Sequence, residues 1–317
     1  MIRAKRTQAA ELEVRLLRNG LCESIHHVHA TVCDDRGRLL SMAGNAEIAT
    51  FIRSALKPFQ ALAVLTTGTL DRYGLNNRDL AIVCGSHHGT IEQARQVFNI
   101  LWRADIDPSA LQCPLPQGQQ SRLQHNCSGK HAGMLAVCQQ RYWPLSAYMQ
   151  SDSPIQQLIL AKVAELLSMP GAEIIGAQDD CGAPTYMLTL VQMAALYAKL
   201  ASGDDLSLER IVRAMTHDPE MVAGEGAFDT ELMRLTAGEV VSKSGAEGIQ
   251  CIGRVGEGMG LALKAIDGAK RAKYAAAIHL LQQLGWIAPE VAEALGDRFL
   301  TLGEHKRLEA SGELTLL

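Results

Sequence analysis

Arg53-Ser-Ala-Leu-Lys-Pro-Phe-Gln-Ala-Leu-Ala-Val-Leu65 is the stretch of the 317-residue chain that decides how its fold and chemistry are interpreted. After Pro58 it is apolar almost all round, which is typical of a helix buried inside a protein. Helical spacing of three places Ser54 and Lys57 on one face, where they can share a proton. A lysine whose pKa is lowered by burial can deprotonate a serine hydroxyl. The stretch therefore predicts a buried helix over residues 51–70 that begins with an activated nucleophile.

A second motif, Lys243-Ser244-Gly245, precedes a predicted hairpin near the C-terminal side. An early Ser-x-x-Lys and a late Lys-[Ser/Thr]-Gly form the paired signature of the penicillin-recognising hydrolases, in which the late strand lines the pocket of the nucleophile. The order of the two motifs in this chain therefore favours a serine hydrolase over an exposed Ser and Lys on a surface helix.

Ser86 belongs to a third motif, Cys84-Gly-Ser-His-His88. It is interpreted either as the N-cap of the following helix or as a second active-site hydroxyl that Lys243 reaches. The neighbouring His87 and His88 offer a metal site or a base as a further alternative, although adjacent side chains rarely converge.

The pattern outside these motifs predicts the fold. Residues 12–42 alternate with period two around turn signals, including Asn19-Gly20, and predict antiparallel strands. The other expected segments are a helix beginning at Ser153-Pro154, a helix over residues 183–201, hairpin strands over residues 248–255 and 260–266, and helices over residues 269–284 and 289–295.

This order predicts an α+β fold, with an antiparallel sheet built from both chain ends and a large helical insertion between them. We expect residues 1–317 to form a single catalytic unit. Its sheet subdomain is expected over about residues 1–50 and 218–317, and its helical subdomain over about residues 51–217.

Composition limits the partners and the compartment. The net charge is −4, and no basic block could follow a phosphate backbone, so no nucleic-acid partner is expected. Residues 1–14 lack the apolar stretch of a secretory signal, and no run is long enough to cross a bilayer. The expected compartment is the cytoplasm, where the 8 scattered cysteines stay reduced.

Two further clusters carry metal-binding residue types: His125-Asn-Cys-Ser-Gly-Lys-His131 and Asp179-Asp-Cys-Gly-Ala-Pro184. Each is expected to open a helix. Two thiols, a carboxylate and a histidine at glycine-rich helix starts are suitable for Zn²⁺. The alternative is that both clusters are tight turns with capping residues.

Together these motifs resemble the rhizobial-type L-asparaginases, the asparaginase II family, over about residues 13–270. The motifs that carry the resemblance are residues 53–60, 84–88, 125–133 and 179–184, with Gly224-Glu-Gly-Ala-Phe-Asp229 and Lys243-Ser-Gly-Ala-Glu-Gly248. The resemblance implies a serine β-lactamase-like fold, a homodimer, and two Ser–Lys pairs, Ser54 with Lys57 and Ser86 with Lys243. It also implies a zinc site made by Cys127, Lys130, Asp179 and Cys181.

The implied activity is hydrolysis of L-asparagine to L-aspartate and ammonia through an acyl-enzyme. Arg53 and His131 are the expected partners of the charged groups of this small amino-acid substrate, and zinc is not expected to supply the nucleophile. The alternatives are a glutaminase or another penicillin-recognising-type serine hydrolase, and, from a different class, a non-catalytic zinc-stabilised binding protein.

Overall fold

A computed structural model describes residues 8–317, which form two compact units. We call residues 8–55, 188–203 and 231–317 the sheet unit, and residues 56–187 and 204–230 the helical unit. Residues 1–7 lie outside the described residues. The predictions that residues 1–14 lack a secretory signal and that the sheet subdomain begins at residue 1 fall partly on them.

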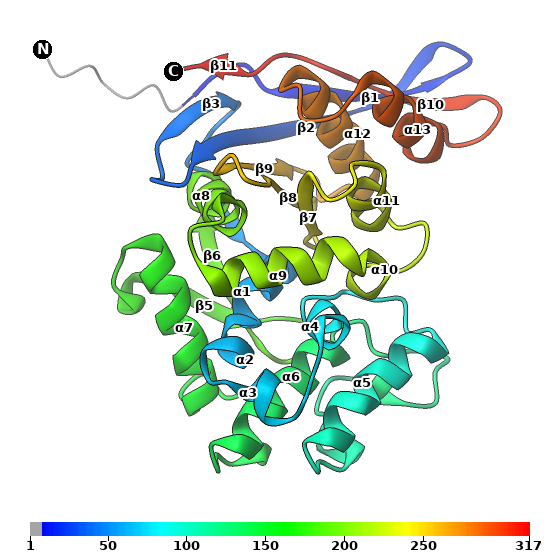
Figure 1. The fold of residues 1–317 in the computed structure, drawn as a ribbon. Coiled ribbons are helices and arrows are strands. Elements are labelled where there is room, and N and C mark those ends of the chain that lie inside the picture. Colours follow the sequence, from blue (N-terminus) through cyan, green and yellow to red (C-terminus); the bar gives the residue numbers. More distant parts are fainter. Residues whose placement is uncertain (1–7) are drawn as a thin grey trace, which may run out of the picture. The chain divides into compact units, whose positions relative to one another are not determined.

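The sheet unit is built on an antiparallel sheet to which both chain ends contribute (Figure 1). Its main path runs in the order β10-β1-β2-β9-β8-β7, and β3 pairs with β2 and with β11. Asn19 and Gly20, with φ of 47° and 80°, form the turn between β1 and β2, because a two-residue hairpin turn favours the left-handed conformation. The predicted antiparallel sheet is therefore confirmed. Its strands are β1 (Leu12–Arg18), β2 (Leu21–Asp34), β3 (Leu39–Ala43), β7 (Val240–Ser244), β8 (Ile249–Arg254), β9 (Met259–Ala265), β10 (Lys306–Ser311) and β11 (Thr315–Leu316).

Helices cover the central strands of this sheet on both faces. Helix α8 (Leu190–Ser202) packs against β2, β8 and β9, and α12 (Lys270–Gln283) packs against β1, β9 and β10 (Figure 1). Gly253 and Gly260 are paired across β8 and β9, and a Cβ atom on Gly260 would lie 2.1 Å from the carbonyl oxygen of Ala194. The two glycines therefore let the backbone of α8 approach the sheet closely. Helix α13 (Pro289–Phe299) packs against α12.

The helical unit is organised around α6 (Ser128–Gln140), whose residues from Ser128 to Cys138 are all buried. Other helices of the unit surround α6, and a hairpin of β5 and β6 completes the unit. The other elements are α1 (Lys57–Gln60), α2 (Leu62–Thr66), α3 (Thr69–Arg72), α4 (Asn77–Val83), α5 (Ile91–Arg103), α7 (Pro154–Leu167), α9 (Leu206–His217), α10 (Pro219–Val222), β5 (Ile175–Gln178) and β6 (Pro184–Thr189); the short strand β4 (Ala49–Phe51) follows β3 in the chain, and α11 (Phe228–Leu235) follows α10.

The prediction of one continuous helix over residues 51–70 is wrong, because the segment is broken into shorter pieces. Residues 53–56 form a 3₁₀ turn, and the rest is divided among the short helices α1, α2 and α3. Gly68 has a φ of 71°, a left-handed conformation that interrupts the helix before α3. The predicted burial does hold, because residues 57–64 are all buried.

The expected helix over residues 183–201 is wrong in its first third. Residues 184–189 form β6, where β-branched and aromatic side chains such as Thr185 and Tyr186 pair with β5. The helix begins only at Leu190, because Thr189 and Gln192 form a capping box there. Residues 188–203 also belong to the sheet unit, whereas the sequence had placed them in the helical subdomain.

Candidate active site

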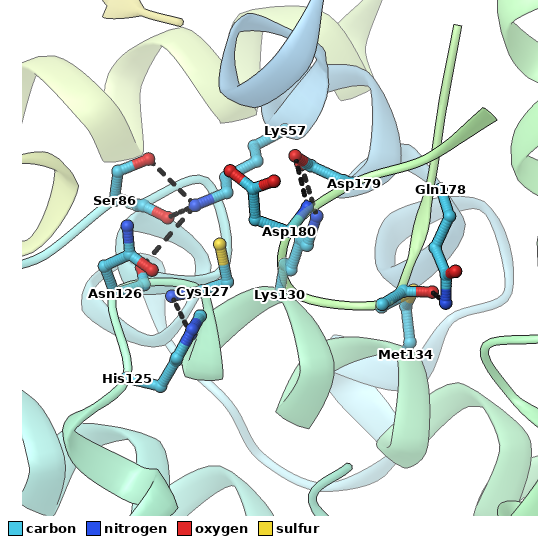
Figure 2. A network of polar contacts seen from close by, with 12 residues as sticks. Lys57, Ser86, His125, Asn126, Cys127, Lys130, Met134, Gln178, Asp179 and Asp180 are labelled. Carbon is cyan, nitrogen blue, oxygen red and sulfur yellow. Dashed lines mark hydrogen bonds and ion pairs between the residues drawn. The ribbon is translucent and has the colours of Figure 1, made fainter. Parts of the chain in front are cut away.

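A lysine and a serine from distant parts of the sequence form a direct hydrogen bond in the helical unit. Lys57, the first residue of α1, is completely buried, and its Nζ atom lies 2.8 Å from Oγ of Ser86. The same Nζ donates to the carbonyl oxygen of Gly85 and reaches that of Asn126 at 3.5 Å (Figure 2). Ser86 is only half-buried, so its hydroxyl is the accessible member of the pair.

The surroundings of Lys57 favour its neutral amine. Burial lowers the pKa of Lys57, and the nearby charge of Lys130 lowers it further, against an opposing effect of Cys127. A neutral amine can donate to the Gly85 carbonyl while its lone pair accepts the proton of the Ser86 hydroxyl. This arrangement makes a weak nucleophile reactive.

Backbone contacts fix the position of this pair. The N–H of Ser86 donates to the carbonyl of Val222 at 2.7 Å, and that of His87 donates to Asn126 at 3.2 Å. A Cβ atom on Gly129, in the first turn of α6, would lie 2.0 Å from the carbonyl oxygen of Ile82 in α4. Helices α4 and α6 therefore meet backbone to backbone, just beside the segments that carry Ser86 and Asn126.

His87 has a structural role in this geometry. Its Nδ1 accepts from the N–H of Gly89, so its Nε2 donates to Ser128 Oγ at 2.9 Å, and Ser128 in turn donates to the carbonyl of Leu123. Burial lowers the pKa of His87 to about 3, so the ring is neutral. His88 is exposed. Ser86 is not the N-cap of the next helix, because Thr90 caps α5.

Two thiols meet beside Lys57. Cys127 is the N-cap residue of α6, and Cys181 precedes β6 in a loop rather than opening a helix as expected. A hydrogen bond from the Cys181 thiol, with the charge of Lys130, outweighs the effect of burial and holds the pKa of Cys127 well below its usual range. The thiolate form of Cys127 is therefore favoured, and the Cys181 thiol donates a hydrogen bond to it.

Lys130 and Asp179 complete this cluster. Lys130 Nζ lies 3.8 Å from Asp179 Oδ2, and both side chains are buried (Figure 2). Burial lowers the pKa of Lys130, but Cys127, Cys181 and Asp179 together raise it more, so the side chain is an ammonium ion. The neighbours of Lys57 and Lys130, which are both buried, thus shift the pKa values of these two lysines in opposite directions.

The residue types of this cluster fit a zinc ion. Two sulfurs, a carboxylate oxygen and an amine nitrogen form a donor set that suits tetrahedral Zn²⁺. Within residues 8–317, no group of three or more His, Cys, Asp or Glu side chains is arranged to hold a metal, so zinc binding would require these side chains to move closer together and Lys130 to lose its proton. In the structure the ammonium of Lys130 compensates the charge of the Cys127 thiolate.

His131 offers a hydrogen-bond donor with no partner. The Tyr148 hydroxyl accepts from the N–H of Gln112 at 2.9 Å and lies 2.7 Å from His131 Nδ1. We assign the hydroxyl as the donor to Nδ1, since it then makes both of its hydrogen bonds, and this assignment puts the ring proton on Nε2. His131 is completely buried, and its Nε2 has no partner among the described residues. A buried unpaired donor costs free energy, which is a reason to expect a ligand or water there.

The other predicted residues lie in the sheet unit. Lys243, on β7, is buried and donates to the carbonyl of Ser244 at 3.0 Å. The segment just before Ser54 is close to this strand, because a Cβ atom on Gly245 would lie 2.9 Å from the carbonyl oxygen of Ile52. Arg53 has a φ of 54°, a strained conformation for a non-glycine residue, and it directly precedes Ser54.

Several supporting residues were not predicted from the sequence. Tyr197 of α8 donates to the carbonyl of Ala55 at 2.8 Å and so anchors the turn of Ser54. Lys273 of α12 donates to the carbonyls of Gly245 and Ile249 and holds the turn after Lys243. The sequence offers one sign of the role of Lys273, which is that a lysine stands among the alanines of α12. The pairings of Ser54 with Lys57 and of Ser86 with Lys243 stay predictions.

Comparisons with known proteins place the chain in a family. The sequence profile of the L-asparaginase II family matches residues 14–316. Among solved structures, one of a protein named Mglu aligns at 15% identity over 87% of this chain and 68% of its own, with a TM-score of 0.42. Its native form aligns at 15% identity over 82% of this chain and 64% of its own, with a TM-score of 0.44. A β-lactamase from Mycobacterium bovis aligns at 12% identity over 86% of this chain and 95% of its own, with a TM-score of 0.38. A search of curated proteins gave no significant match.

The match over nearly the whole chain identifies an enzyme of the amidohydrolase class. The chain belongs to the L-asparaginase II family, as the motifs had indicated. No helix of residues 8–317 has the length and apolar character needed to span a membrane.

Proposed function

We propose that this chain hydrolyses L-asparagine to L-aspartate and ammonia through an acyl-enzyme on a serine that a lysine activates. The observation that supports it most is the hydrogen bond between Ser86 Oγ and the buried, pKa-lowered Lys57 Nζ. The assignment to the L-asparaginase II family supports the choice of amide.

In the proposed reaction, Ser86 Oγ attacks the side-chain amide carbon while Lys57 Nζ accepts the hydroxyl proton. Lysine then returns this proton to the leaving nitrogen, and ammonia departs. Water adds to the resulting ester, losing its proton to Lys57, which returns one proton to Ser86 as aspartate leaves. The buried donor His131 Nε2–H is available to an oxygen of the substrate.

The N–H groups of Ser86 and His87 do not form the oxyanion hole, because both already bond to backbone carbonyls. Groups other than these two amides therefore have to donate to the oxyanion. The remaining predicted residues are Arg53, Ser54 and Lys243. We propose that turnover needs all four predicted Ser and Lys side chains, which are Ser54, Lys57, Ser86 and Lys243.

Zinc is part of the proposal, with Cys127, Lys130, Asp179 and Cys181 as its ligands. When bound, zinc would act as a structural ion that holds the segments of α6 and β6 together. The chemistry of bond cleavage belongs to the Ser and Lys side chains. We also propose that the protein is a cytoplasmic homodimer. Light scattering would measure the mass of the particle in solution and so test the dimer.

Substrate selectivity tests the assignment. A pocket that only excludes one methylene discriminates by about 1–3 kcal/mol, but a reacting carbon displaced by about 1 Å loses on the order of a hundredfold in rate. We therefore expect much higher kcat/KM for asparagine than for glutamine, and no useful turnover of a chromogenic cephalosporin. Ammonia release that is equal or faster with glutamine would make the protein a glutaminase.

Trapping identifies the serine that carries the acyl group. Rapid acid quenching during turnover of asparagine, followed by peptide mass spectrometry, is expected to find the added mass on the Ser86 peptide and none in Ser86→Ala. Added mass on the Ser54 peptide instead would show that Ser54 is the nucleophile, and the protein would still be a serine hydrolase. No ammonia release by the wild-type protein would reject the proposed function itself.

A further inference from the structure

A cavity lies in the helical unit, lined by residues that the proposed reaction does not use. Its volume is about 610 Å³, and its lining comes from α7, from the segment before α7, and from the β5–β6 hairpin. The residues that matter below are Asp152, Gln156, Gln157, Gln178 and the apolar Leu160 and Tyr186.

The polar groups of this cavity are biased toward hydrogen-bond acceptors. Gln156 Nε2 donates to the carbonyl of Tyr148 at 2.9 Å, and Gln157 Nε2 donates to that of Ser151 at 2.8 Å. Gln178 Nε2 donates to the carbonyl of Gly182 at 3.3 Å. Each amide directs its NH₂ group at a backbone carbonyl, which fixes its orientation and leaves its oxygen as the group with capacity for a ligand.

One of these oxygens is buried and has no partner. Gln156 is 1% exposed, and its Oε1 makes no hydrogen bond within the described part of the chain. A buried unsatisfied acceptor costs free energy, so such groups usually have a ligand or water. Gln156 therefore adds a buried, unsatisfied acceptor to a residue that lines this cavity, although its oxygen is covered from solvent.

The charge of the lining is negative. Asp152 is exposed and contributes a carboxylate, and no Lys, Arg or His among the described residues lines the cavity. A zwitterionic amino acid would leave its own carboxylate without a cation. Met149, Leu160, Ile174 and Tyr186 offer apolar walls between the acceptors. The lining thus suits a chain of methylenes that ends in ammonium groups.

We propose that this cavity is a binding site for a small aliphatic diamine, distinct from the Lys57–Ser86 pair. Its ammonium groups donate to the Asp152 carboxylate and to the side-chain oxygens of the exposed Gln157 and Gln178, and its methylenes lie against Leu160 and Tyr186. Figure 2 shows Gln178 beyond Asp179, on the side away from Ser86. The site is therefore next to the segment that carries Asp179 and Cys181, and neither of these two residues lines it.

Isothermal titration of the full chain with 1,4-diaminobutane tests this directly, with 1,4-butanediol as the uncharged ligand of the same length. Saturable binding of the diamine and none of the diol is expected. Equal binding of both ligands, or no saturable binding of the diamine, would overturn the proposal.

Matched variants locate the site. Asp152→Asn should weaken diamine binding about tenfold or more, since a charge-assisted hydrogen bond is lost. Gln157→Glu should tighten binding, because it adds a carboxylate at the same wall. Glu173→Gln removes a charge from an exposed residue outside the lining and should leave the affinity unchanged.

Ser86→Ala separates this site from the one that contains Lys57, and it should bind the diamine as the wild-type protein does. If Ser86→Ala weakens binding as much as Asp152→Asn, or if Asp152→Asn matches Glu173→Gln, the diamine does not bind in this cavity. Thermal unfolding of each variant verifies that it is folded.

Discussion

Lys57 Nζ and Ser86 Oγ lie 2.8 Å apart, although the two residues are separated by 29 positions in the chain. The lysine comes from the first residue of α1 and the serine from the loop after α4. The carbonyl of Gly85, directly before the serine, also accepts from Lys57. The same short segment therefore supplies the hydroxyl and orients the amine that takes its proton.

Replacing Lys57 with Met should lower kcat for ammonia release by roughly 10²–10⁴, because the hydroxyl of Ser86 loses its base. Lys57→Arg should not restore it, since a guanidinium stays protonated. Lys162→Met, a change of a more exposed lysine on α7, is the control and should keep wild-type turnover. Wild-type kcat in Lys57→Met, with an unchanged circular dichroism spectrum, would show that another group is the base.

The thiol cluster predicts zinc in protein purified without chelators, at about one ion per chain. Cys127→Ser and Cys181→Ser should each reduce the zinc content, as measured by elemental mass spectrometry. Cys138→Ser, which alters a buried cysteine elsewhere on α6, should retain it. Removing zinc is expected to weaken substrate binding and to leave the turnover rate at saturating substrate unchanged. The zinc proposal fails if wild-type protein and Cys127→Ser contain equally little metal.

Tyr148→Phe should reduce the free energy of unfolding by about 1–3 kcal/mol, because Gln112 N–H loses its acceptor and His131 Nδ1 loses its donor. It should also raise KM more than it lowers kcat, since His131 is then no longer oriented. Urea unfolding and ammonia release measure the two effects. Tyr142→Phe, at a residue 94% exposed, is the control. Unchanged stability and KM in Tyr148→Phe would mean that the histidine does not contact the substrate.

Asp34 predicts a pH dependence of stability in the sheet unit. Burial raises its pKa, but hydrogen bonds from Arg38 and Arg36 outweigh this and bring the pKa below its ordinary value. A carboxylate with a lowered folded-state pKa contributes stability that is fully present above the unfolded pKa of about 4 and lost as the pH falls through the folded value. Asp34→Asn should therefore be less stable by about 1 kcal/mol at pH 7, with the difference shrinking below about pH 4. A constant difference in urea unfolding at all pH values would contradict this.

The sheet was predictable because its signals are local. Alternating residues and the Asn19-Gly20 turn define β1 and β2, and glycine-bounded apolar segments define β8 and β9. The helix over residues 51–70 was predicted as continuous because apolar composition reports burial and not backbone angles. The left-handed φ at Gly68, which interrupts it, is permitted by the sequence but not specified by it.

The candidate site was predictable as a set of residue types, but its contacts were not. Motifs identify Lys57 and Ser86 separately, whereas their hydrogen bond depends on how α1 and α4 pack. Tyr148 lies in no motif, and only the structure shows that it orients His131. Such contacts are long-range in sequence, and no local pattern encodes them.

The backbone contact between Gly129 of α6 and Ile82 of α4 has a consequence for how the molecule fluctuates. The amide proton of His87 is held by Asn126, just before α6, and that of Ser86 by Val222 of α10, so neither α6 nor α10 can move away from the serine loop without releasing one of them. In native-state hydrogen exchange, these two amides should exchange together with those of α6, at the free energy of the slowest segments. The serine loop is then as long-lived as the core of its unit, unlike the mobile loops that usually carry catalytic residues.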